Sequence, residues 1–265
     1  MDVSGVLDDL IAEQAALDAV VATLLPEQWS TPTPSPRWTV ADQIGHLTFF
    51  DTTATMAITD PEQFVAHRGE LVRQLSDDAG ADEVTLGAFR VLDPDEQLAR
   101  WRGARTALQG AAARLGNEDR VEWYGPSMSA KSFLTARLME VWAHGQDVCD
   151  AVGANRAPTA RLRHIAQLGV ITRGWSYAVR GEEPPDDEVR VELTAPDGDV
   201  WMWGADAAHD SISGPAEDFC LVVTQRRHVD DTDLDVVGAA AREWMEKAQA
   251  FAGGATSGPA PKGHL

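Results

Sequence analysis

Residues 139–147 have the sequence MEVWAHGQD and lie in an apolar, alanine-containing run that is typical of a long helix. Side chains four residues apart on a helix lie one above the other on the same face. Glu140 and His144 are therefore predicted neighbours, and Asp147 lies one further turn along. A carboxylate and an imidazole that project inward from one helix supply half of a divalent-metal site, which facing helices of a bundle complete.

The missing ligand is predicted to come from a second helix, which contains His46. Residues 38–47 have the sequence WTVADQIGHL, in which Thr39 is followed three residues later by an acid, as at a capping-box helix start. The predicted helix runs to about residue 59, with His46 near its start. Gly45, beside His46, is expected to let another helix approach closely.

The residues alone leave two interpretations of this cluster open. His46, Glu140 and His144 form either a metal site or a buried polar network, because a carboxylate inside a bundle is costly without a cation as its partner. One carboxylate and two neutral imidazoles suit zinc, and also iron, manganese or nickel. Three protein ligands leave a coordination position for water or substrate. Asp147 is either an acceptor for the N–H of a ligand imidazole or a solvated helix residue.

The hydrophobic pattern divides the chain into a helical part and a smaller mixed part. Apolar residues recur at helical spacing up to the run EEPPDD at residues 182–187, and beyond it the pattern alternates, as in Val189–Leu193. We expect a mainly α protein with a small α/β domain. The predicted parts are a metal-binding helical bundle at 1–183, an α/β domain at 184–252 and a disordered glycine- and proline-rich tail at 253–265.

The composition is acidic, with a formal net charge of −20. This charge argues against nucleic acid, whose phosphates need a basic surface, and against an anionic membrane surface. The chain has no apolar run of membrane-spanning length and no signal pattern at its start, so we expect a cytoplasmic protein. The acidic stretch at 77–83 is predicted to be a loop.

Arg226 and Arg227 end the apolar run Phe219–Val223 in the second part of the chain. A basic pair at the end of a buried helix can bind the carboxylate of a substrate. It can equally neutralise the helix C-terminus or pair with Asp230 and Asp231. We expect the second role for Arg227, and both roles stay open for Arg226.

These stretches together resemble a known family. The sequences at 38–47 and 140–148 are similar to those of DinB-like metal-binding bundles, specifically the mycothiol-dependent maleylpyruvate isomerase branch, which pairs a glutamate with the second histidine. The segment DFCLVVTQR at 218–226 is similar to the family's apolar helix that closes on an arginine. It departs from the family at Thr224 and Gln225, where small residues and glycine are usual.

The resemblance implies an up-and-down four-helix bundle followed by a small α/β domain. It also implies a divalent metal, zinc in the isomerase, held by His46, Glu140 and His144, with Arg226 reaching the shared cleft as the substrate anchor. In this family the metal lowers the pKa of a low-molecular-weight thiol, mycothiol, for isomerisation or transfer. We therefore expect a metal-dependent enzyme that acts on a small carboxylate-bearing metabolite. Such bundles often form homodimers.

Two alternatives to thiol chemistry remain open. A metal-dependent hydrolase or lyase would use metal-bound water, and thiol-independent turnover would distinguish it. A non-catalytic, metal-stabilised ligand-binding protein would lose thermal stability but no turnover when His46 or Glu140 is replaced. The sequence contains no GxGxxG, P-loop, HExxH or GxSxG motif that would favour another enzyme class.

Overall fold

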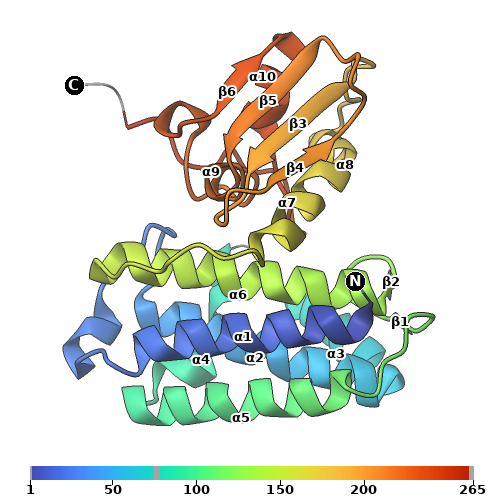
Figure 1. Ribbon diagram of the computed structural model, residues 1–265. Coiled ribbons are helices and arrows are strands. Elements are labelled where there is room, and N and C mark those ends of the chain that lie inside the picture. Colours follow the sequence, from blue (N-terminus) through green and yellow to red (C-terminus); the bar gives the residue numbers. More distant parts are fainter. Residues whose placement is uncertain (1, 75–77, 263–265) are drawn as a thin grey trace. The chain divides into compact units, whose positions relative to one another are not determined.

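The computed structural model describes residues 2–74 and 78–262, and the chain forms two compact units, Met1–Arg156 and Ala157–Leu265. The first unit is helical, and the second contains a four-stranded sheet with helices (Figure 1). This confirms the predicted fold class, a mainly α protein with a small α/β part.

The first unit is built on four long helices. They are α1 (Val3–Val21), α2 (Val40–Thr59), α5 (Pro94–Ala112) and α6 (Ala130–Val152). Helix α2 packs on α5 and α6, and α1 packs on α6. Large apolar side chains that are less than 2% exposed fill the space between these helices; among them are Leu10, Leu17, Ile44, Leu47, Trp101, Leu108 and Phe133. Burial of each such side chain contributes roughly 1.5–3 kcal/mol to folding.

Short signals in the sequence determine where the two helices that carry the predicted ligands begin. At the start of α2, the Thr39 side chain accepts a hydrogen bond from the Asp42 backbone N–H, and the Asp42 carboxylate accepts one from the Thr39 N–H. This confirms the predicted capping box. Ser129 caps α6 by accepting from the Ser132 N–H at 3.2 Å. Gly153, in the left-handed region at a φ of 68°, ends α6.

Two shorter helices connect α2 to α5 and pack on α2. They are α3 (Pro61–Gln74) and α4 (Asp78–Arg90). The prediction of a loop at 77–83 is wrong from residue 78 onward, and residue 77 lies outside the described residues. Helix α4 forms because Leu86 is fully buried and Phe89 packs on Gly45, where a Cβ would lie 3.1 Å from the Phe89 Cβ. Gly45 therefore permits the expected close approach of a helix.

The remaining elements of the first unit are short. A 3-10 helix spans Pro26–Ser30, and two strands, β1 (Arg120–Val121) and β2 (Met128–Ser129), form an antiparallel hairpin before α6. Trp29 of the 3-10 helix is 4% exposed, so the proline-rich segment that follows it is anchored at its start.

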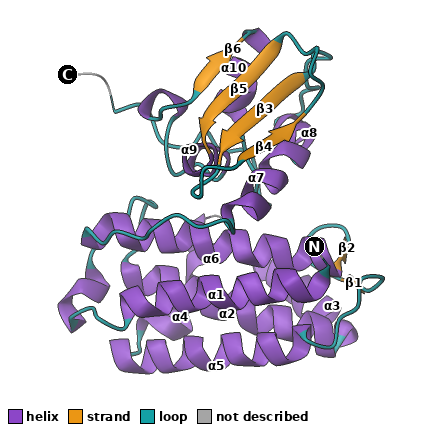
Figure 2. Ribbon diagram, in the orientation of Figure 1, coloured by secondary structure: helices purple, strands orange, loops and turns teal. Residues whose placement is uncertain are grey.

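The second unit is a mixed sheet with helices packed on it (Figure 2). Its strands are β4 (Val200–Trp203), β3 (Val189–Thr194), β5 (Asp210–Pro215) and β6 (Asp235–Val237), in that spatial order. Strand β3 pairs antiparallel with β4 and parallel with β5, and β5 pairs antiparallel with β6. Two helices contact the sheet, α9 (Ala216–Val223) and α10 (Ala239–Lys247), and a 3-10 helix spans Val229–Asp231.

Two helices before the sheet also belong to the second unit. They are α7 (Leu162–Ile171) and α8 (Arg173–Ala178). Helix α7 packs on α9 so closely that a Cβ at Gly169 would lie 2.9 Å from the side chain of Val223. The units therefore divide after residue 156, whereas the change in hydrophobic pattern that guided the prediction lies at residue 183. Helical spacing alone does not reveal which partner a helix packs against.

The described part of the predicted tail, residues 253–262, contains neither helix nor strand but is hydrogen-bonded to the rest of the second unit. The Thr256 hydroxyl donates to the Gln225 side-chain oxygen at 2.6 Å, and the Lys262 N–H donates to the Asp231 carboxylate at 3.0 Å. Residues 263–265 lie outside the described residues.

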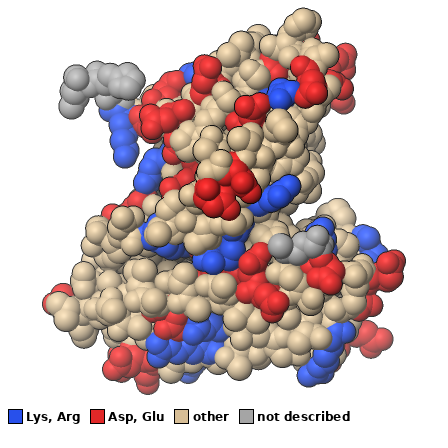
Figure 3. All heavy atoms as spheres, viewed as in Figure 1, with Lys and Arg blue, Asp and Glu red and all other residues tan. Residues whose placement is uncertain are grey.

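The surface carries both signs of charge. Figure 3 shows acidic and basic side chains interspersed over the visible face of the helical unit. Several arginines of this unit are paired with carboxylates, such as Arg102 with Asp18 and Arg90 with Asp42. Within the described residues, no helix combines the length and the apolar character needed to cross a bilayer.

Candidate metal centre

Three of the predicted site residues come together where α2 faces α6. The Nε2 atoms of His46 and His144 lie 3.4 Å and 3.1 Å from the same carboxylate oxygen, Oε2 of Glu140. One ligand atom from each residue lies within 4.8 Å of the other two. Nitrogen and oxygen ligands about 2 Å from a zinc ion are themselves about 3–4 Å apart, so the cluster has the dimensions of a three-ligand site.

The cluster lies between aromatic rings. The Trp38 ring is stacked on His144, with centroids 5.8 Å apart, and is tilted against His46 at 4.9 Å. Phe50 packs against His46, with ring centroids 4.6 Å apart. The Trp38 indole N–H donates to the Asp82 carboxylate on α4 at 3.0 Å, so the helix that the sequence did not predict holds one wall of the site.

The site is enclosed but reachable from solvent. The side chains of His46 and Glu140 are 15% and 23% exposed. Burial, followed by the nearby His144, lowers the pKa of His46 to about 4, although Glu140 opposes this shift. Burial acts to raise the pKa of Glu140, but its close contacts with His144 and His46 outweigh burial and hold that pKa well below its ordinary value. At neutral pH the site therefore offers a neutral imidazole and a carboxylate, the states in which these groups bind metals.

Gln43, which the sequence analysis did not identify, is the hydrogen-bond partner of the Nδ1 atom of His144. The Nδ1 of His144 lies 2.5 Å from Oε1 of Gln43 but 3.8 Å from Oδ2 of Asp147, which accepts a hydrogen bond from the Ser35 hydroxyl at 3.0 Å. Gln43 precedes His46 by three residues on α2, and this same-face spacing is the signal that could have identified it.

Arg226, the predicted substrate anchor, belongs to the second unit and lies just after α9. Its backbone N–H donates to the Leu221 carbonyl, and its Nη1 donates to the Thr224 carbonyl, both at 2.7 Å. Both contacts are with carbonyl groups at the C-terminus of α9, which fits one of the two roles that the sequence left open. The substrate-binding role of Arg226 stays a proposal.

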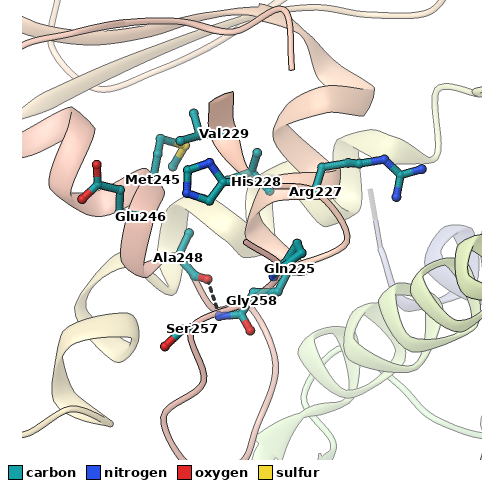
Figure 4. Close-up of a pocket in the computed structure, with 11 residues that line it drawn as sticks. Gln225, Arg227, His228, Val229, Met245, Glu246, Ala248, Ser257 and Gly258 are labelled. Carbon is teal, nitrogen blue, oxygen red and sulfur yellow. Dashed lines mark hydrogen bonds between the residues drawn. The ribbon is translucent and has the colours of Figure 1, made fainter. Parts of the chain in front are cut away.

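A small pocket in the second unit lies beside the end of α9 (Figure 4). Arg227, His228 and Glu246 are among the residues that line it, and the Gln225 amide donates to the Ala248 carbonyl at 3.0 Å. Its volume of about 10 Å³ is about the least that can hold one water molecule. The pocket is therefore too small to bind a metabolite.

A known protein family matches the first unit of the chain. The sequence pattern described as the mycothiol maleylpyruvate isomerase N-terminal domain matches residues 10–149. The chain belongs to this family. The matched stretch includes His46, Glu140 and His144. A second pattern, described as wyosine base formation, matches residues 185–237, which include all four strands of the sheet.

The similar proteins include members of the same size. Two uncharacterised proteins of Mycobacterium tuberculosis, from strains CDC 1551 / Oshkosh and ATCC 25618 / H37Rv, are each 44% identical over 245 residues. These alignments cover 92% of this chain and 94% of each relative. The similarity therefore extends through both units.

Solved structures of this fold include the mycothiol-dependent maleylpyruvate isomerase. It is 16% identical to this chain with a TM-score of 0.58, and the match covers 85% of this chain and 90% of the isomerase. A variant of the isomerase with one histidine replaced by alanine matches at 15% identity with the same TM-score and coverage. At this identity the likeness shows a shared fold.

Proposed function

We propose that this protein is a metal-dependent enzyme of the mycothiol-dependent isomerase or S-transferase type. His46, Glu140 and His144 would hold one divalent ion, with zinc the first candidate. The observation that carries the proposal is the convergence of both imidazole Nε2 atoms on one oxygen of a partly exposed carboxylate. A divalent ion held by these residues would lower the pKa of a thiol, so that thiolate would be available at neutral pH.

The residues around the ligands have supporting roles. Trp38 and Phe50 flank the imidazoles and restrict the water that reaches them, which strengthens electrostatic interactions inside the site. Asp147 adds a negative charge beside the cluster, with its Oδ2 atom 3.8 Å from Nδ1 of His144. The negative charge of Asp147 favours a bound cation.

The thiol would have to be a separate molecule. Burial raises the pKa of Cys149, and it raises that of Cys220 well above its ordinary value. Both cysteines are buried, so neither supplies an accessible thiolate. These observations, together with membership of the family, support a low-molecular-weight thiol such as mycothiol as the cosubstrate.

The substrate is proposed to be a small metabolite that carries a carboxylate. Arg226 is the proposed anchor, because a guanidinium binds a carboxylate through two parallel hydrogen bonds. Its Nη1 already donates to the Thr224 carbonyl, so this group is held in place at the end of α9.

The first experiment measures metal content by elemental mass spectrometry on untagged wild-type protein and on His144→Ala. We expect about one equivalent of metal in the wild type and none in the variant, because three ligands are needed to hold the ion. Turnover of maleylpyruvate is then assayed with and without mycothiol. Metal-dependent turnover without a thiol would indicate the hydrolase or lyase alternative. Absence of metal from the wild type after reconstitution with zinc, iron, manganese and nickel would contradict the proposal.

A further inference from the structure

A chain of hydrogen bonds leads from the proline-rich segment before α2 to His144. The Thr33 backbone N–H and hydroxyl both lie within hydrogen-bond distance of the Trp38 carbonyl oxygen, at 2.8 Å and 2.9 Å. A carbonyl oxygen only accepts, so the Thr33 hydroxyl proton is directed toward Trp38. The hydroxyl oxygen is then left to accept, and the side-chain nitrogen of Gln43 lies 2.9 Å from it.

This arrangement fixes which way the Gln43 amide faces. With its NH₂ group toward Thr33, its oxygen Oε1 faces His144 Nδ1 at 2.5 Å. The reversed amide would place its oxygen against a hydroxyl whose proton is already directed elsewhere, and would lose a hydrogen bond. Gln43 is fully buried, so no water replaces a lost partner.

The orientation of the amide determines the tautomer of His144. Because Gln43 Oε1 can only accept, the ring proton of neutral His144 lies on Nδ1. The Nε2 atom then carries a lone pair, and it faces Oε2 of Glu140 at 3.1 Å. A lone pair and a carboxylate oxygen both attract a cation, so this tautomer prepares the cluster to bind one.

We propose that Gln43, itself oriented by Thr33, is a positioning residue that holds His144 in the Nδ1–H tautomer and thereby sets the affinity of the centre for a divalent cation. The second half of this inference rests on the proposed metal site. The first half concerns the metal-free protein, and it is testable by itself. Gln43 is a neutral acceptor, so it directs the imidazole without adding negative charge to the buried site.

The variants are chosen to change the acceptor with little change in volume. Gln43→Met removes the acceptor, and Gln43→Glu retains one. Thr33→Val removes the hydroxyl that orients the amide and provides a second test if Gln43→Met does not fold. Gln97→Met is the matched control, because Gln97 is a buried glutamine whose amide donates to the Phe89 carbonyl at 3.0 Å on another helix.

The first readout is the protonation of the His144 ring nitrogens in metal-free protein, by ¹H–¹⁵N NMR at a pH where imidazole is neutral. The His144 signals are assigned by their loss in His144→Ala. We expect Nδ1–H in the wild type, in Gln43→Glu and in Gln97→Met. In Gln43→Met and Thr33→Val we expect a shift toward Nε2–H, which can donate to Glu140. The same tautomer in wild type and Gln43→Met would overturn the positioning role.

The second readout is zinc affinity, by competition with a chelator at fixed pH. We expect affinity about 10–100-fold weaker in Gln43→Met, the usual effect of removing the partner of a metal-binding histidine. Gln97→Met should bind zinc as the wild type does. Equal affinity in wild type and Gln43→Met would overturn the link from tautomer to metal. A wild-type protein that binds no zinc or other divalent metal would instead overturn the proposed function, while the tautomer result would still decide the role of Gln43.

Discussion

Two carboxylates at the interface of α2 and α6, Asp51 and Glu140, have different kinds of partner. Asp51 is fully buried and lies 2.9 Å from the guanidinium of Arg137, which is 3% exposed. Glu140 is 23% exposed, and its partners are the imidazoles of His46 and His144. Arginine keeps its charge at any ordinary pH, whereas an imidazole is neutral or charged depending on its surroundings.

The difference separates a structural ion pair from a site that can bind a cation. Burial raises the pKa of Asp51 even though Arg137 opposes this shift, while the imidazoles hold the pKa of Glu140 low. The Asp51 pair contains its own permanent cation. The cluster of Glu140 with two imidazoles does not, and the low pKa of His46 keeps that ring neutral at neutral pH. We infer that the first carboxylate serves stability and the second serves binding.

The largest expected effect follows from breaking the structural pair. Arg137→Met leaves Asp51 buried without its cation, and the free energy of unfolding should fall by about 3–5 kcal/mol. Urea denaturation measures this loss. Zinc content should stay at the wild-type level, because Arg137 is not a ligand.

The matched control for this prediction removes both charges. The double variant Asp51→Leu, Arg137→Met should recover most of the lost stability, since buried ion pairs are often replaceable by apolar side chains of similar volume. A double variant as unstable as Arg137→Met would show that Asp51 and Arg137 contribute to stability beyond neutralising each other's charge.

The second prediction concerns Glu140, whose partners are two imidazoles and not a permanently charged cation. Zinc at about one hundred times its dissociation constant should stabilise the wild type by about 2.7 kcal/mol through mass action. Glu140→Gln, which lacks the charged ligand, should gain almost nothing from zinc. Urea denaturation with zinc or with a chelator measures both. Equal stabilisation of the two proteins would place the ion elsewhere.

Local sequence signals predicted the helices that carry the site. The capping box at Thr39 and Asp42 determined the start of α2, and the four-residue spacing placed Glu140 beside His144. His46 was predicted as the ligand from a facing helix, and the resemblance to the family implied the same three residues. The capping box and the four-residue spacing were predictable because each depends on residues within one or two helical turns.

Features that depend on distant contacts were not predictable. Helix α4 forms in an acidic stretch because Leu86 and Phe89 pack against α2, which tertiary context alone decides. The role of Gln43 depends on Thr33, ten residues earlier, and on His144 in another helix. No periodic pattern contains that information.

The third prediction tests Arg226, which the sequence placed at a helix end without deciding its role. Arg226→Ala should weaken binding of the proposed carboxylate-bearing substrate to the zinc-loaded protein about tenfold, equivalent to about 1.4 kcal/mol. Isothermal titration calorimetry measures this change. Arg227→Ala is the matched control and should bind within about twofold of the wild type. Equal binding by wild type and Arg226→Ala would remove Arg226 from the site.

The smallest expected effect comes from an ion pair that is partly open to water. Asp18 on α1 accepts hydrogen bonds from Arg102, which is 46% exposed, and from Arg105. The bond from Arg102 lowers the pKa of Asp18, although burial opposes it. A carboxylate whose pKa is lowered by folding adds stability above its unfolded pKa of about 3.9, and this stability is lost as the pH falls through the folded value.

Asp18→Asn should therefore reduce stability at neutral pH by about 1 kcal/mol or less, because solvent screens this pair. The difference between wild type and variant should shrink as the pH falls below about 4. Urea denaturation at a series of pH values measures both trends. Asp18 and Asp51 both pair with arginine, but the Asp18 pair is more exposed to solvent. If Asp18→Asn lost as much stability as Arg137→Met, the identity of the cation, and not burial, would determine how much stability is lost when such a pair is broken.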